Sequence, residues 1–233
     1  KIVKKTFFIF KISYSKIIYN SLNKDYGKNL CFRGFNMELE KFLDPIQLFN
    51  KWFDDAKNNE PRDPNAMQLA TVSKDGMPSV RTVLLKDIID GGFVFYTNYE
   101  SRKSDEIFQT GKGAICFYWK SLNRQVRLVG KIKKVDQEIS DLYFSQRSKG
   151  SRVGAWASMQ SRPLDSRKTL INRVKEYEKK FDVNIPRPKH WGGFSLTPTE
   201  FEFWQDGKFR LHDRFILKPT KDGKLWKANR YYP

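Results

Sequence analysis

Short runs of strand-forming residues, separated by turn residues, constrain the fold of this chain more than any other feature. In the segment 124–135, apolar residues such as Val126 and Leu128 alternate with charged residues such as Arg127 and Lys131. This period of two residues is typical of a strand with one buried side and one polar side. We expect further strands at residues 67–72, 80–86, 93–97, 114–119, 193–196, 201–204, 210–217 and 225–231.

Tight turns connect the first of these strands. The segments 74–76 and 90–92 each contain Asp and Gly, which favour the backbone angles of hairpin turns. The strands that flank them are therefore expected to form an antiparallel meander.

Four other segments have the apolar spacing of amphipathic helices. The best signalled one starts at Asp44, a capping residue type, with Pro45 at the first helical position. The expected helices cover residues 44–53, 101–109, 136–147 and 164–181. Because strands outnumber helices and do not alternate regularly with them, we predict a mainly β fold of the α+β class, an antiparallel barrel with helices packed outside it. The same pattern argues against a doubly wound parallel sheet.

Length and cysteine content narrow the class of protein. With 233 residues the chain is long enough for one sizeable core. It contains no run of about 18 apolar residues, so we expect no membrane-spanning segment. Cys31 and Cys116 are too few and too far apart for a disulfide framework, and no metal-ligand spacing is visible. These features predict a soluble, cytoplasmic protein without a metal.

Positive charge is in large excess. The chain has 44 Lys and Arg residues against 26 Asp and Glu residues, a net charge of +18 at pH 7. Residues 1–36 hold eight basic residues and a single acid, Asp25. We interpret residues 1–36 as a basic N-terminal tail without the features of a targeting signal, and residues 37–233 as one domain. Such an excess predicts an anionic partner: nucleic acid, acidic lipid or a phosphorylated small molecule.

The first candidate anion site is the start of the helix expected at 101–109. Backbone N–H groups at a helix start attract anions, so the cations Arg102 and Lys103 are misplaced there unless a phosphate lies between them. The alternative is a solvated helix start, at which Asp105 and Glu106 compensate both cations.

A second candidate site lies on the helix expected at 136–147. Tyr143 and Arg147 are four residues apart and share a face of this helix, and Ser151 is expected just past its end. A phenol, a guanidinium and a hydroxyl suit a phosphate monoester. Alternatively, Tyr143 packs against apolar neighbours and Arg147 is solvated.

The third candidate site follows Trp204. If residues 210–217 form a strand, then Arg210, His212 and Arg214 project to one face and surround the one plausible catalytic imidazole with cations. A structural histidine is the alternative. No nucleophilic triad or paired-carboxylate motif is visible, so a cofactor has to supply the reaction.

Several motifs, in this order, resemble those of the pyridoxine/pyridoxamine 5′-phosphate oxidase family. They span residues 44–233. The matching stretches are Arg81-Thr82-Val83-Leu84-Leu85-Lys86, Phe95-Tyr96-Thr97-Asn98, Ser101-Arg102-Lys103, Asn123-Arg124-Gln125-Val126-Arg127, Gln160-Ser161-Arg162, Trp191-Gly192-Gly193, Glu202-Phe203-Trp204-Gln205 and Arg210-Leu211-His212-Asp213-Arg214.

The resemblance implies a split β-barrel that forms a homodimer and binds FMN noncovalently at the subunit interface. By resemblance, the cofactor contacts are Arg81, Thr82, Val83, Leu84, Tyr96, Thr97, Arg102, Lys103, Gln125, Gln160, Ser161, Trp204 and Arg214. The substrate contacts are Lys86, Tyr143, Arg147, Ser151, Arg210 and His212, of which Arg210 and His212 lie beside the reacting carbon as the catalytic residues.

The activity that this resemblance implies is an oxidation in vitamin B6 salvage. Pyridoxamine 5′-phosphate and pyridoxine 5′-phosphate are oxidised at C4′ to pyridoxal 5′-phosphate by transfer of a hydride equivalent to FMN. Dioxygen then reoxidises the flavin and yields H2O2, and the amine substrate also releases ammonia. Neither nucleic acid nor a membrane is an implied partner.

One stretch departs from the family pattern. Family members often carry an Arg three residues before a Tyr that closes over the substrate. Here Tyr26 is present, but Asn23 stands where the Arg is expected. We expect a partly ordered lid near residues 22–30 and leave the role of Tyr26 open.

Two rival functions remain open on the sequence. A nucleic-acid-binding β-barrel is supported by the net charge and by an aromatic content of 15%. A split-barrel flavin reductase is the second rival, although the six matching substrate-side residues argue against it. A colourless protein is expected for the first rival, and a flavoprotein that ignores pyridoxamine 5′-phosphate for the second.

Overall fold

The computed structural model describes residues 44–181 and 184–233, so the tail and the lid expected near residues 22–30 lie outside the described residues. Its strands are β1 (Ala66–Val72), β2 (Pro78–Leu84), β3 (Asp87–Ile89), β4 (Gly92–Asn98), β5 (Lys112–Trp119), β6 (Arg124–Lys134), β7 (Trp191–Gln205), β8 (Asp213–Pro219) and β9 (Trp226–Tyr231). Its helices are α2 (Pro45–Asn59), α3 (Arg102–Thr110), α4 (Gln137–Ser145), α5 (Lys149–Ala157) and α6 (Arg167–Lys180), with short 3-10 turns η2 (Lys120–Leu122) and η3 (Lys208–Arg210).

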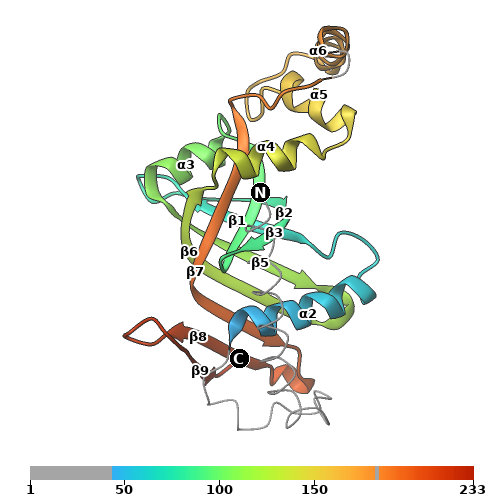
Figure 1. The fold of residues 1–233 in the computed structure, drawn as a ribbon. Coiled ribbons are helices and arrows are strands. Elements are labelled where there is room, and N and C mark those ends of the chain that lie inside the picture. Colours follow the sequence, from blue (N-terminus) through green and yellow to red (C-terminus); the bar gives the residue numbers. More distant parts are fainter. Residues whose placement is uncertain (1–43, 182–183) are drawn as a thin grey trace, which may run out of the picture. The chain divides into compact units, whose positions relative to one another are not determined.

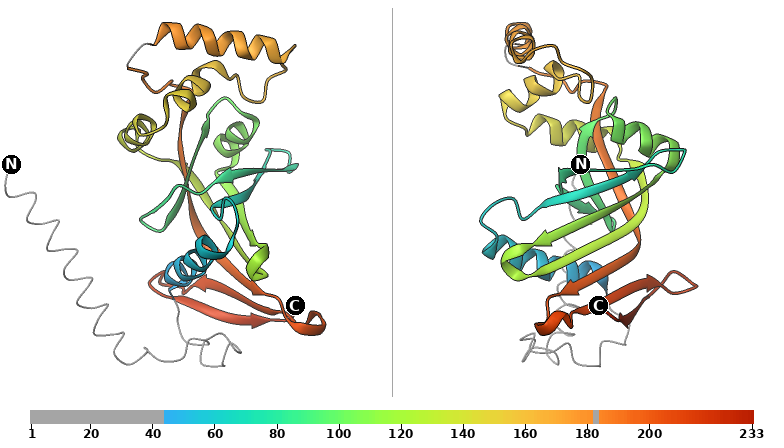
Figure 2. Two further views of the ribbon diagram at one scale, coloured as in Figure 1. Left: turned by 90° about the vertical axis from the view of Figure 1, so that its right-hand side faces the viewer. Right: turned by 180° about the vertical axis from the view of Figure 1, so that it is seen from behind.

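The described strands form one curled antiparallel sheet (Figure 1). Its order is β2-β1-β5-β6-β7-β4-β3, and β8 and β9 continue from β7. Helices α4, α5 and α6 gather toward one end of the long strand β7, whereas the β8–β9 hairpin pairs alongside its other end; Figure 2 shows the same separation from two further sides. The mainly β, split-barrel prediction is therefore confirmed.

Large aromatic side chains form the core between the sheet and helix α2. The alternation in β6 is as predicted, since Val126 and Leu128 are fully buried. Helix α2 covers this core: the Phe49 ring lies 4.8 Å from that of Phe93, and the Trp52 ring 5.3 Å from that of Phe203. Each buried ring contributes on the order of 2 kcal/mol through the apolar area that it removes from water.

Local signals set the ends of the helices. The Asp44 side chain accepts hydrogen bonds from the backbone N–H groups of Ile46 and Gln47, so the predicted cap of α2 is confirmed. Gly111 ends α3 in the left-handed conformation, with φ of 63°. Helix α6 begins later than predicted, because Ser166 caps it and accepts from the Thr169 N–H group.

The predicted meander is wrong beyond its first hairpin. Strand β2 pairs with β1 and ends the sheet, whereas β4 pairs with the short β3 and with β7. The turn residues determine local pairing only, and the chain leaves β2 to reach the opposite end of the sheet. The two strands predicted at 193–196 and 201–204 are also one strand, β7.

A bulge makes that continuous strand possible. The register between β6 and β7 shifts between Val129 and Gly130, opposite Pro198, which has no N–H to donate. A side chain at position 130 does not fit, because a Cβ there would lie 2.1 Å from the Thr197 carbonyl oxygen. The glycine thus lets β6 follow a strand that contains a proline.

Two further predictions fail near the candidate site residues. Ser151 is not past a helix end but in the first turn of α5, a helix that the prediction missed. Arg210 is not in a strand: it ends η3 with φ of 64°, next to Phe209 with φ of 57°. Arg210, His212 and Arg214 therefore do not share one strand face, since β8 begins only at Asp213.

No helix in the described ranges is long and apolar enough to cross a bilayer.

Candidate functional site

A cavity of about 1130 Å³ opens where the two ends of the sheet approach each other. Strand β2 supplies one wall with residues 79–84, and β4 supplies the facing wall with residues 96–98. The start of α3, the α4–α5 region and the segment 158–161 complete the lining. The curl of the sheet thus brings together segments that are far apart in strand order.

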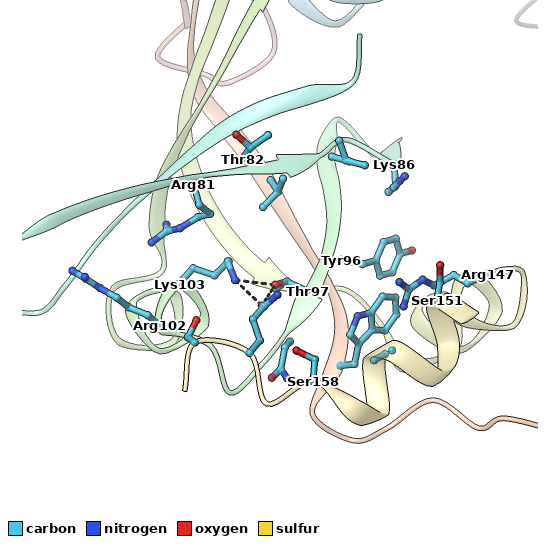
Figure 3. A pocket seen from close by; sticks show the side chains of 18 of the residues that line it. Arg81, Thr82, Lys86, Tyr96, Thr97, Arg102, Lys103, Arg147, Ser151 and Ser158 are labelled. Carbon is cyan, nitrogen blue, oxygen red and sulfur yellow. Dashed lines mark hydrogen bonds between the residues drawn. The ribbon is translucent and has the colours of Figure 1, made fainter. Parts of the chain in front are cut away.

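One end of the cavity is rich in cations (Figure 3). Lys103 is only 8% exposed. Its Nζ donates to Thr97 Oγ1 at 3.1 Å, to Ser101 Oγ at 2.9 Å and to Gln160 Oε1 at 2.9 Å. All three acceptors are neutral, and no salt bridge of Lys103 with a carboxylate occurs within residues 44–181 and 184–233.

The environment of Lys103 shifts its proton equilibrium. Burial, and secondly the nearby charge of Arg81, lower the pKa of Lys103 to about 8. Arg81 and Arg102 line the same end of the cavity. A buried ammonium group beside two guanidinium groups is a strong anion site, because an added anion relieves both the burial cost and the repulsion.

The opposite end of the cavity holds the second predicted cluster. The ring of Tyr143 stacks on that of Tyr96 with centroids 3.9 Å apart, and Tyr96 lies 5.3 Å from the ring of Trp191. The Arg147 guanidinium lies over Trp191, with its Cζ 4.6 Å from the ring centroid. Ser151 belongs to α5, where its hydroxyl accepts from Ser148 Oγ at 2.9 Å.

Arg147 has unused hydrogen-bonding capacity. Its Nη1 is buried and has no hydrogen-bond partner in the part of the chain that the structure describes. Burial lowers the pKa of Arg147 from the usual arginine value, although a guanidinium stays charged. Arg147 and Lys86 are therefore suited to bind a second anion, separate from the one at Lys103 (Figure 3).

Most of the predicted site residues line this cavity. From the predicted cofactor set these are Arg81, Thr82, Val83, Leu84, Tyr96, Thr97, Arg102, Lys103, Gln160 and Ser161. From the predicted substrate set these are Lys86, Tyr143, Arg147 and Ser151. The lining also includes residues that the prediction missed, among them Ser79, Ser148 and Ser158. Ser148 caps α5, so recognition of that cap could have identified it.

The other predicted residues form a second cluster, outside this cavity. Gln125, Trp204 and Arg214 are successive cross-strand neighbours on β6, β7 and β8. His212 packs on Trp204 with ring centroids 4.6 Å apart, and its Nδ1 lies 3.0 Å from Asp206 Oδ1.

The two clusters lie near opposite ends of the long strand β7, so they are far apart within one chain. Trp191, at the start of β7, lines the cavity, whereas Trp204 lies near the end of the strand. At about 3.3 Å per residue, a strand of 15 residues spans up to roughly 50 Å. Arg210 follows in an exposed loop in which Phe209 is 91% exposed.

The curled antiparallel sheet, with a cation-lined cavity between its ends, is a split β-barrel of the type found in flavoproteins. A structure of an FMN-binding protein from Nostoc punctiforme, described as pyridoxamine 5′-phosphate oxidase-related, has this fold: its TM-score is 0.66 at 19% identity, over 82% of this chain and 98% of that one. PhzG from Burkholderia lata in complex with tetrahydrophenazine-1-carboxylic acid gives a TM-score of 0.76 at 32% identity, over 82% and 93%.

Sequence comparison identifies the family. Residues 53–181 match the family model described as pyridoxamine 5′-phosphate oxidase, and residues 191–233 match that of the pyridoxine 5′-phosphate oxidase C-terminal dimerisation region. Pyridoxine/pyridoxamine 5′-phosphate oxidases of Brucella canis and Brucella suis are each 53% identical over 192 residues, 82% of this chain and 94% of theirs. The chain belongs to the pyridoxamine 5′-phosphate oxidase family, as its motifs predicted.

Proposed function

We propose that this protein oxidises pyridoxamine 5′-phosphate and pyridoxine 5′-phosphate to pyridoxal 5′-phosphate, with bound FMN and with dioxygen as the electron acceptor. The reaction releases H2O2, and ammonia from the amine. The observation that carries this proposal is the presence of two separate cation clusters in one cavity, because FMN and the substrate each bring one phosphate. Family membership supports the same reaction.

The residues at the Lys103 end fit the phosphate of FMN. A phosphate dianion supplies the negative charge that Lys103 lacks within the described protein, and Arg81 and Arg102 add charge-assisted hydrogen bonds. Strand β2 ends the sheet, so residues 81–84 have backbone groups on one edge that no other strand within residues 44–181 and 184–233 uses. When bound, FMN supplies the hydride acceptor of the reaction.

The residues at the other end fit the phosphate of the substrate. Arg147 and Lys86 supply two positive charges, and Tyr143 and Ser151 supply hydroxyl groups. The stacked rings of Tyr96 and Tyr143 limit the movement of this wall, which favours one orientation of a bound pyridine. Holding C4′ of the substrate in a fixed position is the main contribution of these residues to the rate.

A second subunit completes the site. Gln125, Trp204 and Arg214 bind FMN, and Arg210 and His212 lie beside the substrate ring, all from the partner of a homodimer. The match of residues 191–233 to a dimerisation region supports this arrangement, as does the exposure of Arg210. The Arg210 guanidinium would there hold the substrate ring in the orientation that hydride loss from C4′ requires.

We further propose that the enzyme acts in the cytoplasm and uses neither nucleic acid nor a membrane as a partner. The cation clusters lie inside a cavity, where they serve small phosphorylated molecules better than a polymer. The only ligands required are then FMN, the two phosphorylated substrates and dioxygen.

An assay of the purified protein tests this function. We expect a yellow protein with one FMN per subunit that converts pyridoxamine 5′-phosphate under air to pyridoxal 5′-phosphate, with equal amounts of H2O2 and ammonia. Pyridoxamine without its phosphate is the matched control, and it should react far more slowly. A colourless protein that binds oligonucleotides, or a flavoprotein that leaves pyridoxamine 5′-phosphate unchanged, would refute the proposal.

FMN affinity should depend on pH through Lys103. Its pKa in the unliganded protein is about 8, and a bound phosphate dianion favours the protonated form, so binding takes up a proton above that pH. The Kd for FMN is therefore expected to rise from about pH 8 upward, with a slope of at most about tenfold per pH unit. Titration of the flavin-free protein by fluorescence quenching at several pH values measures this.

The Lys103→Gln variant is the control for this pH profile. Its FMN affinity should be lower at neutral pH and nearly flat above pH 8. The folding stability of the flavin-free protein should respond in the opposite direction. Burial, together with Arg81, lowers the pKa of Lys103 below its value in the unfolded chain, so the charged ammonium group destabilises the fold at neutral pH. This destabilisation disappears as the pH rises from about 8 to the pKa of Lys103 in the unfolded chain. If the Kd for FMN of Lys103→Gln depends on pH in the same way as that of the wild type, Lys103 is not the group that causes the pH dependence.

A further inference from the structure

A buried carboxylate lies behind the cations that we assign to the FMN phosphate. Glu106 is in the middle of α3 and only 4% exposed. It lies outside the motifs that carry the family resemblance. Burial of a charged carboxylate is costly unless hydrogen bonds and opposite charges compensate it, so its partners indicate what it does.

Glu106 contacts both cavity arginines, one directly and one mainly through hydroxyl groups. Its Oε1 accepts from Arg102 Nε at 2.9 Å. Its Oε2 accepts from Ser79 Oγ at 2.5 Å and from Thr71 Oγ1, and lies 3.5 Å from Arg81 Nη2. Arg81 in turn donates to the same two hydroxyl groups. One carboxylate thus fixes the orientation of two guanidinium groups on different elements, β2 and α3.

The hydrogen bonds keep Glu106 charged. Although burial alone would raise its pKa, the bonds from Ser79, Thr71 and Arg102, together with the charge of Arg102, lower the pKa of Glu106 to about 2. Glu106 is therefore an anion at every pH at which an enzyme of this kind works.

The charges at this end of the cavity balance one phosphate. The formal charges of Arg81, Arg102, Lys103 and Glu106 sum to +2. A phosphate monoester carries close to two negative charges at neutral pH, so the bound state is nearly neutral. Without the carboxylate, the two guanidinium groups would repel each other and lose their common hydrogen-bonded support.

We propose that Glu106 is a positioning residue for flavin phosphate binding: it holds Arg81 and Arg102 in the orientation that the phosphate requires. This inference rests on the proposed function, since it takes FMN as the ligand of this end of the cavity. Positioning depends on where the hydrogen-bonding oxygens lie, whereas a purely electrostatic role depends only on the charge.

Two conservative variants separate position from charge. Glu106→Gln keeps the length of the side chain but removes the charge and replaces one of the two accepting oxygens by an NH2 donor. Glu106→Asp keeps the charge but withdraws the carboxylate by one methylene group. We expect Asp to bind FMN at least tenfold more weakly than wild type although it keeps the charge, and Gln to bind it more weakly as well, because only one end of the amide accepts hydrogen bonds. If Asp binds like wild type while Gln is altered, the charge alone matters and the proposal is wrong.

Riboflavin, which lacks the phosphate, controls for general damage to the fold. Both variants should bind riboflavin with a Kd within twofold of wild type, measured by fluorescence quenching of flavin-free protein. Equal losses of FMN and riboflavin affinity in Glu106→Asp would show a structural role only. Glu100→Gln is the matched control. Glu100 is an exposed acid just before the same helix, and it pairs with Arg162, so this variant should leave both affinities unchanged. Failure of the wild type itself to bind FMN would instead refute the proposed function.

Discussion

Replacing Arg210 by alanine is expected to lower kcat for pyridoxamine 5′-phosphate by about 10²–10³-fold while the purified protein stays yellow. The reason is that Arg210 is assigned to the substrate ring, where it orients C4′ for hydride transfer, and not to the flavin. Removal of one preorganised electrostatic group from an active site typically has an effect of this size. Single-turnover reduction of the flavin under anaerobic conditions measures the step without the reaction with dioxygen.

Arg102→Ala is the reciprocal variant. Arg102 lines the cavity at the Lys103 end. Its replacement by alanine should weaken FMN binding by about 10–100-fold, the usual range for a lost charge-assisted hydrogen bond. Once saturated with FMN, this variant should turn over at nearly the wild-type rate. Equal flavin retention in the two purified variants, or a normal kcat for Arg210→Ala, would contradict the assignment of the two arginines.

The parts of the fold that could be predicted from the sequence are those governed by neighbouring residues. The alternation in β6 and the cap at Asp44 are local, and both predictions were correct. The pairing of β4 with β7 joins residues about one hundred positions apart, and no turn signal specifies it. For the same reason the curl that forms the cavity could not be predicted from the turn signals.

Three local errors have physical causes. Two strands were predicted at 193–196 and 201–204, but the bulge at Gly130 lets one strand run past Pro198. Helix α5 was missed because its two glycines, Gly150 and Gly154, weaken the helical signal, and the Ser148 cap that begins it was not recognised. The loop at Phe209 and Arg210 has two successive residues with positive φ, which residues other than glycine rarely adopt, so a strand was the natural expectation.

The candidate site was predicted from two kinds of information. Local patterns suggested the anion site at Arg102 and Lys103, the pair Tyr143 and Arg147 and the cluster after Trp204. Resemblance to a family supplied the rest. Glu106 illustrates the limit of spacing. The sequence suggested an acid that compensates a solvated helix start, and it does pair with Arg102, but the fold buries it between α3, β1 and β2. Only the packing of α3 on the edge of the sheet shows that one carboxylate holds two arginines.

Activity should reappear when two inactive variants are combined, because we propose that each active site uses residues of both subunits. Arg147→Ala disrupts the cavity of its own chain, whereas Arg210→Ala removes a group that the chain contributes to its partner's cavity. In a heterodimer of the two variants, both defects fall in the same site and the other site is intact. After random exchange of subunits, half of the dimers are heterodimers, so about a quarter of the wild-type activity is expected.

Coexpression with two different affinity tags provides the measurement. Tandem purification isolates the heterodimer, for which about half of the wild-type activity per dimer is expected, since one of its two sites is intact. The doubly substituted chain Arg147→Ala/Arg210→Ala, coexpressed with wild type, is the matched control. Its heterodimer has one defect in each site and should be nearly inactive. If the site lies within one chain, the results reverse: the mixture of single variants stays inactive, and the heterodimer of wild type with the double variant keeps half of its activity.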